Sequence, residues 1–439
     1  MNIAERELKD ARAGKSRPEV PRKSKKEFHP LSALGPGLIT GAADDDPSGI
    51  ATYSQAGAQL GLNALWTALI TYPLMAAVQS ICARIGRVTG KGLSENIRAT
   101  FPGSVALVVV GLLLVANVVN VAADLAAMGE GARLVFGGNK HFYTVGFAVS
   151  SLLLQIFVPY HHYVRYLKWI TISLLSYVAV ALVVHVPWLE ALQRTVLPKI
   201  AFDRTTATLV TALFGTTISP YMFFWHSSEE VEEIHDDPRA EPLKRAPRQA
   251  PRELKRIGWD TWVGMAYSNV IAFFIMLATA VTLHATGHTN IQTAAEAARA
   301  LAPVAGRFAA TLFALGIVST GLLAVPVLAG SAAYAIAEAR GWKEGLGRTF
   351  ADAREFYGVI AFSIAAGIAL DFSPLDPIKA LFWSAVVNGV IAVPLMAVIM
   401  ILSSRKSVMG RFVAPPWQLV LGWIATAIMG AVAVGMIAF

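Results

Sequence analysis

Apolar stretches long enough to cross a lipid bilayer recur along almost the whole chain. The hydrocarbon core of a bilayer is about 30 Å thick, and a helix needs about 20 residues to span it. Eleven such stretches lie at approximately 34–58, 62–86, 104–127, 142–159, 164–187, 205–227, 260–286, 304–338, 355–371, 378–402 and 417–439. Because backbone groups in lipid need internal hydrogen bonds, the sequence predicts an all-α polytopic membrane protein with about 11 transmembrane helices.

The basic residues are distributed unevenly between the two sides of these stretches. If the N-terminus is cytosolic, 29 of the 37 lysines and arginines fall on the cytosolic side. This positive-inside pattern predicts a protein of the cell membrane with a cytosolic N-terminus and an external C-terminus. It also explains the net charge of +8 without a nucleic-acid partner; we expect the lipid bilayer as partner, and the oligomeric state stays open.

Two polar segments frame the domain organisation. Residues 1–29 are basic and lack the apolar core of a signal peptide, which predicts a cytosolic tail. Residues 30–439 are expected to form a single transmembrane transporter domain, with 228–258 as a cytosolic loop between the sixth and seventh stretches. The single cysteine, Cys82, excludes an intrachain disulfide and any cysteine-rich metal site.

Two of the apolar stretches are interrupted at matching places. Proline, glycine and charge break the first stretch at 44–49, and the sixth is broken around 219–222. Unwound backbone at membrane depth is tolerated where it lines a cavity or coordinates a ligand. An offset of five stretches reverses topology, so the sequence predicts a LeuT-type 5+5 inverted repeat with helices 1 and 6 broken at the substrate site.

The simpler interpretation is that Pro47 and Pro220 only kink two packed helices. The three aspartates in the first break, Asp44, Asp45 and Asp46, argue for a function there. Each ionised carboxylate at a helix centre costs roughly 2.5 to 3.5 kcal/mol on insertion scales. Packing alone does not require that cost.

Four segments resemble the Nramp family of divalent-metal transporters. They are GPGLITGAADDDPSGIATYSQAGAQLG in the first stretch, ADLAAMGEGARLVFG in the third, GTTISPYMFFWHS in the sixth and VVNGVIAVPLMAVIMILSSRKSVMG in the tenth. The resemblance extends over most of the chain from Leu34 onward. It implies the eleven-helix LeuT-type fold and cation transport that is commonly coupled to protons as symport.

The resemblance also implies a metal site, which this chain keeps only in part. The family's metal-binding aspartate falls on Asp46 and its asparagine on Gly49. The methionine before the sixth-helix proline falls on Ser219. The glutamine of the tenth-helix pair falls on Gly389, while Asn388 is retained. One strong ligand side chain therefore remains.

These departures favour a hard cation. Without the thioether the site loses its preference for soft ions, whereas a carboxylate, a hydroxyl and backbone carbonyls suit Mg²⁺, which keeps several waters. The sequence thus resembles Nramp-related magnesium transporters, with Mn²⁺ as the alternative ion and an organic cation or other small solute as an alternative substrate. The predicted site also includes Asp45, Ala43 and Thr216 beside the breaks. No cofactor is expected, since the cation is the substrate.

Asp44 and Asp45 precede the matched aspartate, where the family usually has uncharged residues. Adjacent carboxylates can share a proton, so one of them is a candidate proton carrier. The alternative is that one caps the following half-helix. Further along that half-helix, Tyr53 is either a gate residue or a packing residue.

An acidic stripe follows the second break. His226, Glu230 and Glu233 share one helical face, with Glu229 adjacent. The stripe predicts an exit vestibule that attracts cations, and the resemblance places a histidine of the proton path at His226. The alternative is a solvated helix end.

The third stretch carries Asn117, Asn120 and Asp124 at helical spacing. The resemblance assigns proton transfer to Asp124, whereas hydrogen bonding between helices is the better interpretation of the asparagines. A following family glutamate is missing at Ala127, and Glu130 appears three residues on. We therefore expect weak or absent proton coupling, with protons as a candidate partner only.

Two other classes of function compete with a carrier. An intramembrane aspartyl hydrolase needs carboxylates from separate helices, but here they cluster in one segment without a GxGD-like pattern or HExxH. We therefore expect no enzyme. A channel or receptor on the same fold stays open, and saturable, electrogenic flux would distinguish a carrier from both.

Overall fold

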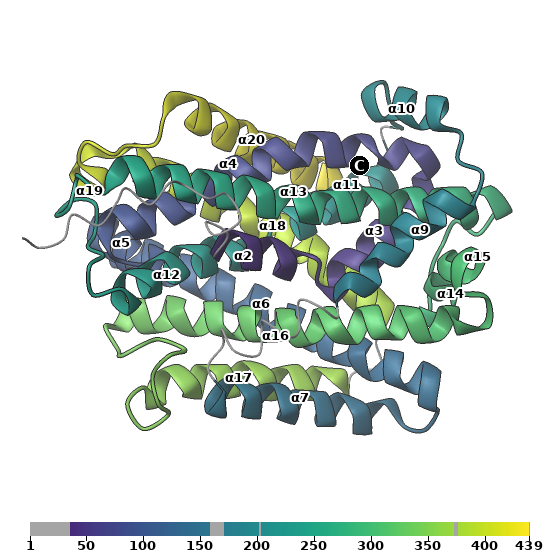
Figure 1. Ribbon diagram of the computed structural model, residues 1–439, viewed down its shortest axis with the longest axis horizontal. Helices are drawn as coiled ribbons and strands as arrows, with labels where there is room; N and C mark the ends of the chain where they lie inside the picture. The colour runs from purple at the N-terminus through teal and green to yellow at the C-terminus, as the bar shows by residue number, and fades with distance from the viewer. Residues whose placement is uncertain (1–35, 159–170, 202, 373–375, 439) are drawn as a thin grey trace, which may run out of the picture.

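The computed structural model describes residues 36–158, 171–201, 203–372 and 376–438, and within these ranges all regular structure is helical (Figure 1). The helices are α2 (Pro36–Asp44), α3 (Pro47–Leu60), α4 (Trp66–Thr89), α5 (Leu93–Thr100), α6 (Gly103–Phe136), α7 (Lys140–Phe157), α9 (Leu175–Val183), α10 (Trp188–Val196), α11 (Arg204–Thr217), α12 (Pro220–Asp236), α13 (Ala250–Thr282), α14 (Ala294–Ala298), α15 (Ala302–Ala305), α16 (Ala309–Arg340), α17 (Arg354–Asp371), α18 (Pro377–Ser404), α19 (Lys406–Met409) and α20 (Pro416–Ala438). The predicted basic tail, 1–29, lies outside the described residues.

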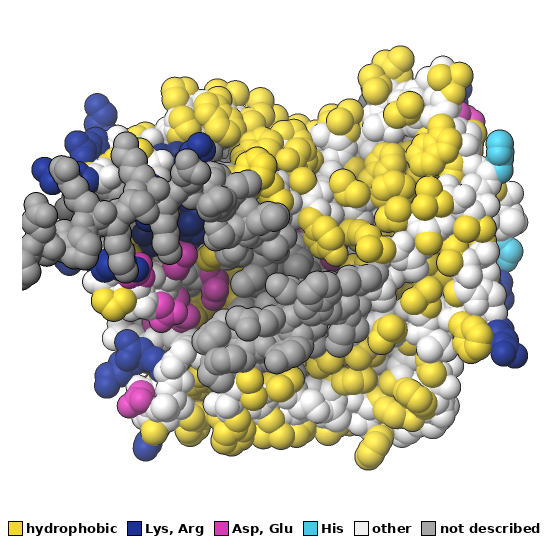
Figure 2. All heavy atoms as spheres, in the orientation of Figure 1, with side chains coloured by type: hydrophobic (Ala, Val, Ile, Leu, Met, Phe, Trp, Pro, Cys, Tyr) yellow, Lys and Arg dark blue, Asp and Glu magenta, His cyan; other side chains and the backbone are white. Residues whose placement is uncertain are grey.

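The long helices have the dimensions and surface of membrane spans. Seven helical segments of the described chain are long and apolar enough to cross a bilayer. In Figure 2 hydrophobic side chains cover much of the top, the bottom and the right half of the face, whereas most of the visible Lys, Arg, Asp and Glu side chains lie towards the left end and a few at the right edge. The two 18-residue helices α7 and α17 coincide with two further predicted stretches. The stretch 164–187 is described only in part, so the count of eleven stays a prediction.

Both predicted helix breaks are present. α2 ends at Asp44 and α3 begins at Pro47, while α11 ends at Thr217 and α12 begins at Pro220. Each proline occupies the first turn of the new half-helix, where a backbone N–H has no partner within the helix, so the lack of an N–H on proline costs no hydrogen bond. Proline therefore starts each second half-helix here, instead of kinking a continuous one.

The two broken helices pack against each other, and the helix that follows each of them packs on the other. α2 packs on α12 and α3 packs on α11. α4, which follows the first broken helix, packs on α12, whereas α13, which follows the second, packs on α2 and α3. α6, α7, α16 and α17 form a second layer, below these helices in Figure 1. This reciprocal packing is the arrangement expected of two repeats that face each other.

Glycines let the helices of this bundle approach closely. A Cβ atom on Gly41 of α2 would lie 2.2 Å from the carbonyl oxygen of Gly264 on α13. One on Gly86 of α4 would lie 2.2 Å from the carbonyl oxygen of Ser227 on α12. Small residues at such crossings let backbones pack directly, which is how helices associate inside a membrane.

The connection between the sixth and seventh stretches is shorter than predicted. α12 continues to Asp236 and α13 already begins at Ala250. Both ends of the predicted loop 228–258 are therefore helical. The remaining connection is held to the end of α4, because the N–H of Leu243 donates to the carbonyl of Arg87 at 3.1 Å. We call this end of the bundle, which includes α5 and α19, the α5 end, and the opposite end, with α10 and α14, the α10 end (Figure 1).

Candidate metal site at the two helix breaks

Asp46 sits between α2 and α3 and is almost fully buried. Its Oδ1 atom accepts hydrogen bonds from the backbone N–H of Gly49 at 2.6 Å and from the hydroxyl of Ser48 at 2.7 Å. Asp46 is therefore the N-cap of α3. The expectation that Asp44 or Asp45 caps this half-helix is wrong, because the cap must be the residue directly before Pro47.

The second break contributes neutral oxygen atoms to the same place. The hydroxyl of Tyr221 donates to the carbonyl of Ala43 at 3.1 Å and lies 3.5 Å from Oδ2 of Asp46. The hydroxyl of Thr216 lies 3.4 Å from that of Ser48. The structure thus brings the predicted residues Asp46, Ala43 and Thr216 together through Ser48 and Tyr221.

Ser219 is oriented differently. Its hydroxyl donates to the carbonyls of Gly215 at 2.8 Å and Thr216 at 2.7 Å, back along α11. These bonds satisfy carbonyl groups that the end of a helix leaves unpaired. The described contacts place no hydrogen bond between Ser219 and Asp46, so in this conformation the serine supports the break from its own side.

Gly49 and Gly389, the two glycines at positions where the resemblance predicts ligands, have different surroundings. A Cβ atom on Gly49 would lie 3.3 Å from the ring of Tyr53 and 3.4 Å from the hydroxyl of Thr216, so the tyrosine borders the space beside Asp46. A Cβ atom on Gly389 would lie 2.5 Å from the carbonyl oxygen of Thr211. Gly389 therefore serves the close contact between α11 and α18, where a glutamine does not fit.

Tyr53 also links the two broken helices. Its hydroxyl lies 2.9 Å from that of Thr217, which in turn donates to the carbonyl of Leu213. The hydroxyl of Tyr53 is therefore the donor in this pair. The bond joins α3 to the end of α11, one helical turn from Gly49.

Asp44 and Asp45 are buried but lie on the side of α13. The hydroxyl of Ser268 is 2.5 Å from Oδ2 of Asp44 and 3.1 Å from Oδ1 of Asp45. Among the described residues the second oxygen of each carboxylate has no hydrogen-bond partner. Two buried carboxylates that share one hydroxyl donor form a site at which a proton can be held.

Asp124 lies in the second layer and faces the first break. It is fully buried on α6, and within the described structure neither of its carboxylate oxygens makes a hydrogen bond. It is close enough to Asp46 to interact with it electrostatically. The structure therefore places this predicted proton-path residue beside the metal-site carboxylate.

The asparagines of α6 join helices, as their sequence context indicated. The amide of Asn117 donates to the carbonyl of Leu328 at 2.9 Å and to the hydroxyl of Ser331 at 2.7 Å. The amide of Asn120 donates to Oδ1 of Asn388 at 3.0 Å. These bonds connect α6 to α16 and α18.

Glu130 does not replace the missing glutamate. Its carboxylate pairs with Arg133 at 2.5 Å on the partly exposed end of α6. The position that the family's glutamate would occupy, Ala127, is buried and apolar. Asp124 consequently has no acidic neighbour on its own helix.

The acidic stripe of α12 is paired with arginine at the α5 end. Arg256 lies 2.6 Å from both Glu230 and Glu233 and 3.1 Å from Glu253, which also contacts Arg87 at 3.2 Å. Glu230 is fully buried, so the alternative of a solvated helix end is wrong for it. In this conformation the predicted vestibule is an ion-pair network that joins α4, α12 and α13.

His226 is fully buried one turn before that network. Its Nδ1 atom lies 3.3 Å from Oε1 of Gln79 on α4, and its Nε2 atom has no hydrogen-bond partner in the part of the chain that the structure describes. The structure thus separates His226 from Asp46 along α12, on the α5 side of the break.

The number of acidic or imidazole ligands at the breaks is small. Among the described residues, no three His, Cys, Asp or Glu side chains converge to hold a metal ion. A cation beside Asp46 would therefore have one carboxylate and complete its shell with hydroxyl, carbonyl and water oxygens. Such a shell suits a hard cation that retains water.

The sequence of this chain matches a known protein family over nearly all of the described helices. The family described as "Natural resistance-associated macrophage protein-like" (Nramp) matches residues 37–439. The chain belongs to the Nramp family. The predicted resemblance is confirmed, and it covers all of the helices described above except the first residue of α2.

Relatives of this Nramp chain are similar over nearly their full length. A protein of Klebsiella pneumoniae (strain 342), named divalent metal cation transporter MntH, is 27% identical over 416 residues, which cover 91% of this chain and 92% of the relative. The protein of the same name from Acidiphilium cryptum (strain JF-5) is 26% identical over 401 residues, covering 87% and 84%.

Solved structures show the same fold. A mutant of the Eremococcus coleocola manganese transporter superposes with a TM-score of 0.72 at 16% identity, covering 95% of this chain and 88% of that one. Mhp1, a nucleobase-cation-symport-1 family transporter, superposes with a TM-score of 0.58 at 14% identity, covering 92% of each chain. The predicted all-α LeuT-type fold is confirmed.

Three residues of the site were not predicted from the sequence. Ser48 directly follows Pro47 and Tyr221 directly follows Pro220, whereas Ser268 lies on α13. The first two share a signal, because the residue after a helix-starting proline is fixed at the break. Ser268 has no local signal, since its role depends on how α13 packs against α2.

Proposed function

We propose that this chain is a secondary transporter that moves a divalent metal cation across the cell membrane by alternating access. The observation that carries the proposal is the surroundings of Asp46, a buried carboxylate at a helix break. Its neighbours are the hydroxyls of Ser48 and Tyr221, with the carbonyl of Ala43 adjacent. The names of the relatives, divalent metal cation transporter and manganese transporter, support a divalent metal as substrate.

Within that class we propose Mg²⁺ as the preferred ion, with Mn²⁺ as its competitor. Oxygen ligands alone suit Mg²⁺, whereas softer transition metals gain from sulfur. Ser219 stands where the family resemblance puts a methionine, so that ligand is lost. The proposed site is Asp46 with Gly49, Ala43, Thr216 and backbone oxygens of both breaks.

We propose weak or absent proton coupling. Asp124 and His226 are both buried and available, but no second acid continues the path on α6. Asp44 and Asp45, each with one carboxylate oxygen unpartnered among the described residues, are the alternative proton carriers beside the break. A carrier without a continuous chain of titratable groups is expected to follow the electrochemical gradient of its ion.

For alternating access we propose that the α5 end is cytosolic and closed in this conformation. The positive-inside distribution of Lys and Arg supports this orientation. Arg256, bound between Glu230 and Glu233, holds α12 to α13 there. Release of the ion would require these pairs to separate, after which the freed carboxylates would form the predicted acidic vestibule. Tyr53 and Thr217 are the proposed barrier on the opposite side.

The test is uptake by purified protein in liposomes, with Mg²⁺ and Mn²⁺ offered separately and together while an internal dye reports pH. We expect saturable uptake of both ions, inhibition of Mn²⁺ uptake by Mg²⁺ at similar concentration, and little change in internal pH. Mn²⁺ uptake that is insensitive to a large excess of Mg²⁺ would refute the preference. Acidification in step with uptake would refute the proposed lack of coupling.

A further inference from the structure

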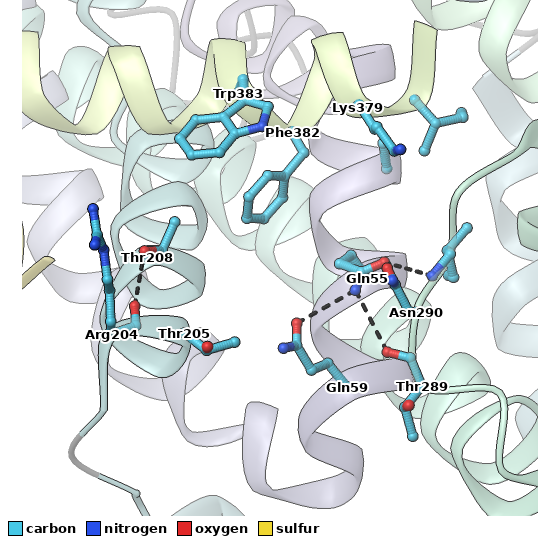
Figure 3. Close-up of a pocket in the computed structure, with 13 residues that line it drawn as sticks. Gln55, Gln59, Arg204, Thr205, Thr208, Thr289, Asn290, Lys379, Phe382 and Trp383 are labelled. Carbon is cyan, nitrogen blue, oxygen red and sulfur yellow. Dashed lines mark hydrogen bonds between the residues drawn. The ribbon is translucent and has the colours of Figure 1, made fainter. Parts of the chain in front are cut away.

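A pocket of about 460 Å³ opens at the α10 end, away from the ion-pair network. α3, α11, α18 and the segment before α14 surround it (Figure 3). Its lining includes the side chains of Gln55, Gln59, Arg204, Lys379 and Phe382. We call this space the α10-end pocket.

Two exposed basic side chains, Arg204 and Lys379, line the α10-end pocket. In the described structure the side chains of Arg204 and Lys379 form no ion pair, and none of the 13 lining residues is acidic. The nearest carboxylates in sequence, Asp203 and Asp376, accept hydrogen bonds from the N–H groups of Thr206 at 2.8 Å and Ile378 at 2.9 Å. They cap the two helices instead of pairing with the two cations.

The two helix starts at the pocket do not add to this positive charge. α11 and α18 both begin there, but the carboxylates of Asp203 and Asp376 cap them and offset the partial positive charge that each start carries. A pocket on the path of a bare divalent cation would be expected to carry the opposite sign, because like charges lower the local concentration of the ion. The charge therefore points to an anionic ligand.

The uncharged lining can bind hydroxyl and carboxylate groups together. Oε1 of Gln55 accepts from the N–H of Ile291 at 2.8 Å, and its amide nitrogen donates to Oε1 of Gln59 at 3.3 Å. The amide nitrogen of Gln59 is thereby left to donate into the pocket. The ring of Phe382 points down from α18 towards the same space (Figure 3).

These features fit a small organic anion. A volume of about 460 Å³ lies in the range of small-molecule sites. Arginine binds carboxylates through two parallel hydrogen bonds, while lysine supplies a point charge and amides serve hydroxyls. We propose that the α10-end pocket binds a small hydroxylated polycarboxylate, either free or as its complex with a divalent cation. This goes beyond the proposed transport function and does not depend on Asp46.

Calorimetric titration of the purified full chain with citrate tests the proposal. We expect saturable binding by the natural chain and at least a tenfold weaker affinity in the double variant Arg204→Gln/Lys379→Gln. The matched control is Lys199→Gln, which removes an exposed lysine from the same end of the molecule but outside the pocket, and it should bind as the natural chain does. Thermal melting and Mg²⁺ uptake without citrate verify that both variants are folded and keep the metal site.

Two further titrations, with magnesium-saturated citrate and with inorganic phosphate, define the ligand. If free citrate binds more tightly than magnesium-saturated citrate, the pocket takes the free anion, and the reverse order assigns it to the complex; either result supports the proposal. Inorganic phosphate should bind at least tenfold more weakly. No saturable citrate binding, equal binding by the double variant, or equal binding of phosphate would overturn the assignment, while intact Mg²⁺ uptake would leave the transport proposal standing.

Discussion

The two helix breaks share a geometry but differ in chemistry. The first break holds three buried carboxylates, whereas the second, at Ile218 and Ser219, has no charged residue. Instead, the neutral hydroxyl of Tyr221, just after the second break, donates a hydrogen bond to the carbonyl of Ala43 at the first break. The two repeats are therefore not equivalent at the breaks: one provides the charge that would hold the proposed cation, and the other provides neutral groups that can move away at little electrostatic cost.

The three carboxylates of the first break also differ from one another. Asp46 is fixed by the start of α3 and faces the second broken helix, whereas Asp44 and Asp45 share Ser268 on α13. Asp46 alone is thus placed between the two repeats. The predictions below test this division, from the largest expected effect to the smallest.

The largest effect is expected at Asp46. Asp46→Asn retains a side chain that can cap α3 but removes the negative charge, and we expect uptake to fall by at least about 100-fold, above the 10–100-fold loss typical of outer-shell metal partners. Asp46→Ala should abolish uptake as well, and it should also destabilise the fold by about 1 kcal/mol because the cap is lost. Uptake assays and thermal melting of both variants separate the two roles. Uptake near the natural rate in Asp46→Asn would contradict the assignment of the site.

The next effect concerns the uncharged break. Ser219→Met restores the sulfur that the family resemblance places there, and we expect the ratio of Mn²⁺ to Mg²⁺ affinity to rise about tenfold, equivalent to about 1.4 kcal/mol. Ser219→Leu is the matched control, since it has similar size and also loses the bonds to Gly215 and Thr216. Competition uptake measures the ratio. An equal rise in the leucine variant would mean that size, not sulfur, changes the selectivity.

A smaller effect is expected where the two breaks touch. Tyr221→Phe removes the hydroxyl that bonds to the carbonyl of Ala43, and an unmade buried hydrogen bond costs about 1 kcal/mol. We therefore expect the KM for metal uptake to rise about fivefold. Tyr357→Phe makes the same change at the α5 end, where the hydroxyl bonds to Arg348 at 2.9 Å, and should leave KM unchanged. An unaltered KM in Tyr221→Phe would show that the second break does not support the ion.

The smallest effect is expected at Asp124. Because Ala127 is apolar and Glu130 is paired with Arg133, Asp124 has no acidic neighbour on α6 that would continue a proton path. Asp124→Asn should therefore change Mg²⁺ uptake by less than about threefold, which corresponds to less free energy than the roughly 1 kcal/mol of one buried hydrogen bond. Internal pH should stay constant in both proteins. A pH change that the natural chain shows and Asp124→Asn lacks would instead establish proton coupling through this residue.

The sequence predicted the first break better than the second for a physical reason. Charge and proline at Asp46 and Pro47 conflict with a membrane-spanning helix, so their position is visible in the sequence alone. At the second break the polar groups are hydroxyls, which a helix tolerates by bonding to its own carbonyls, as Ser219 does. Its link to the first break depends on Tyr221, whose orientation follows from the packing of α12.

Charge compensation was also invisible in the sequence. Glu230 and Glu233 form an acidic face on α12, but their partner Arg256 lies on the next helix, and only the packing of α13 on the bundle brings it within 2.6 Å. Gly389 is a similar case, because its closeness to Thr211 reflects how α18 crosses α11. Local patterns predicted elements and breaks, whereas contacts between repeats required the fold.

The most direct test is to locate the ion. Crystals grown with Mn²⁺ as a substitute for Mg²⁺ would show its position by anomalous scattering. We predict one strong peak between the two breaks, about 2.0–2.3 Å from a carboxylate oxygen of Asp46, with its remaining ligands oxygen atoms and waters. A peak held by Asp44 and Asp45 on the side of Ser268, with none at Asp46, would contradict the account.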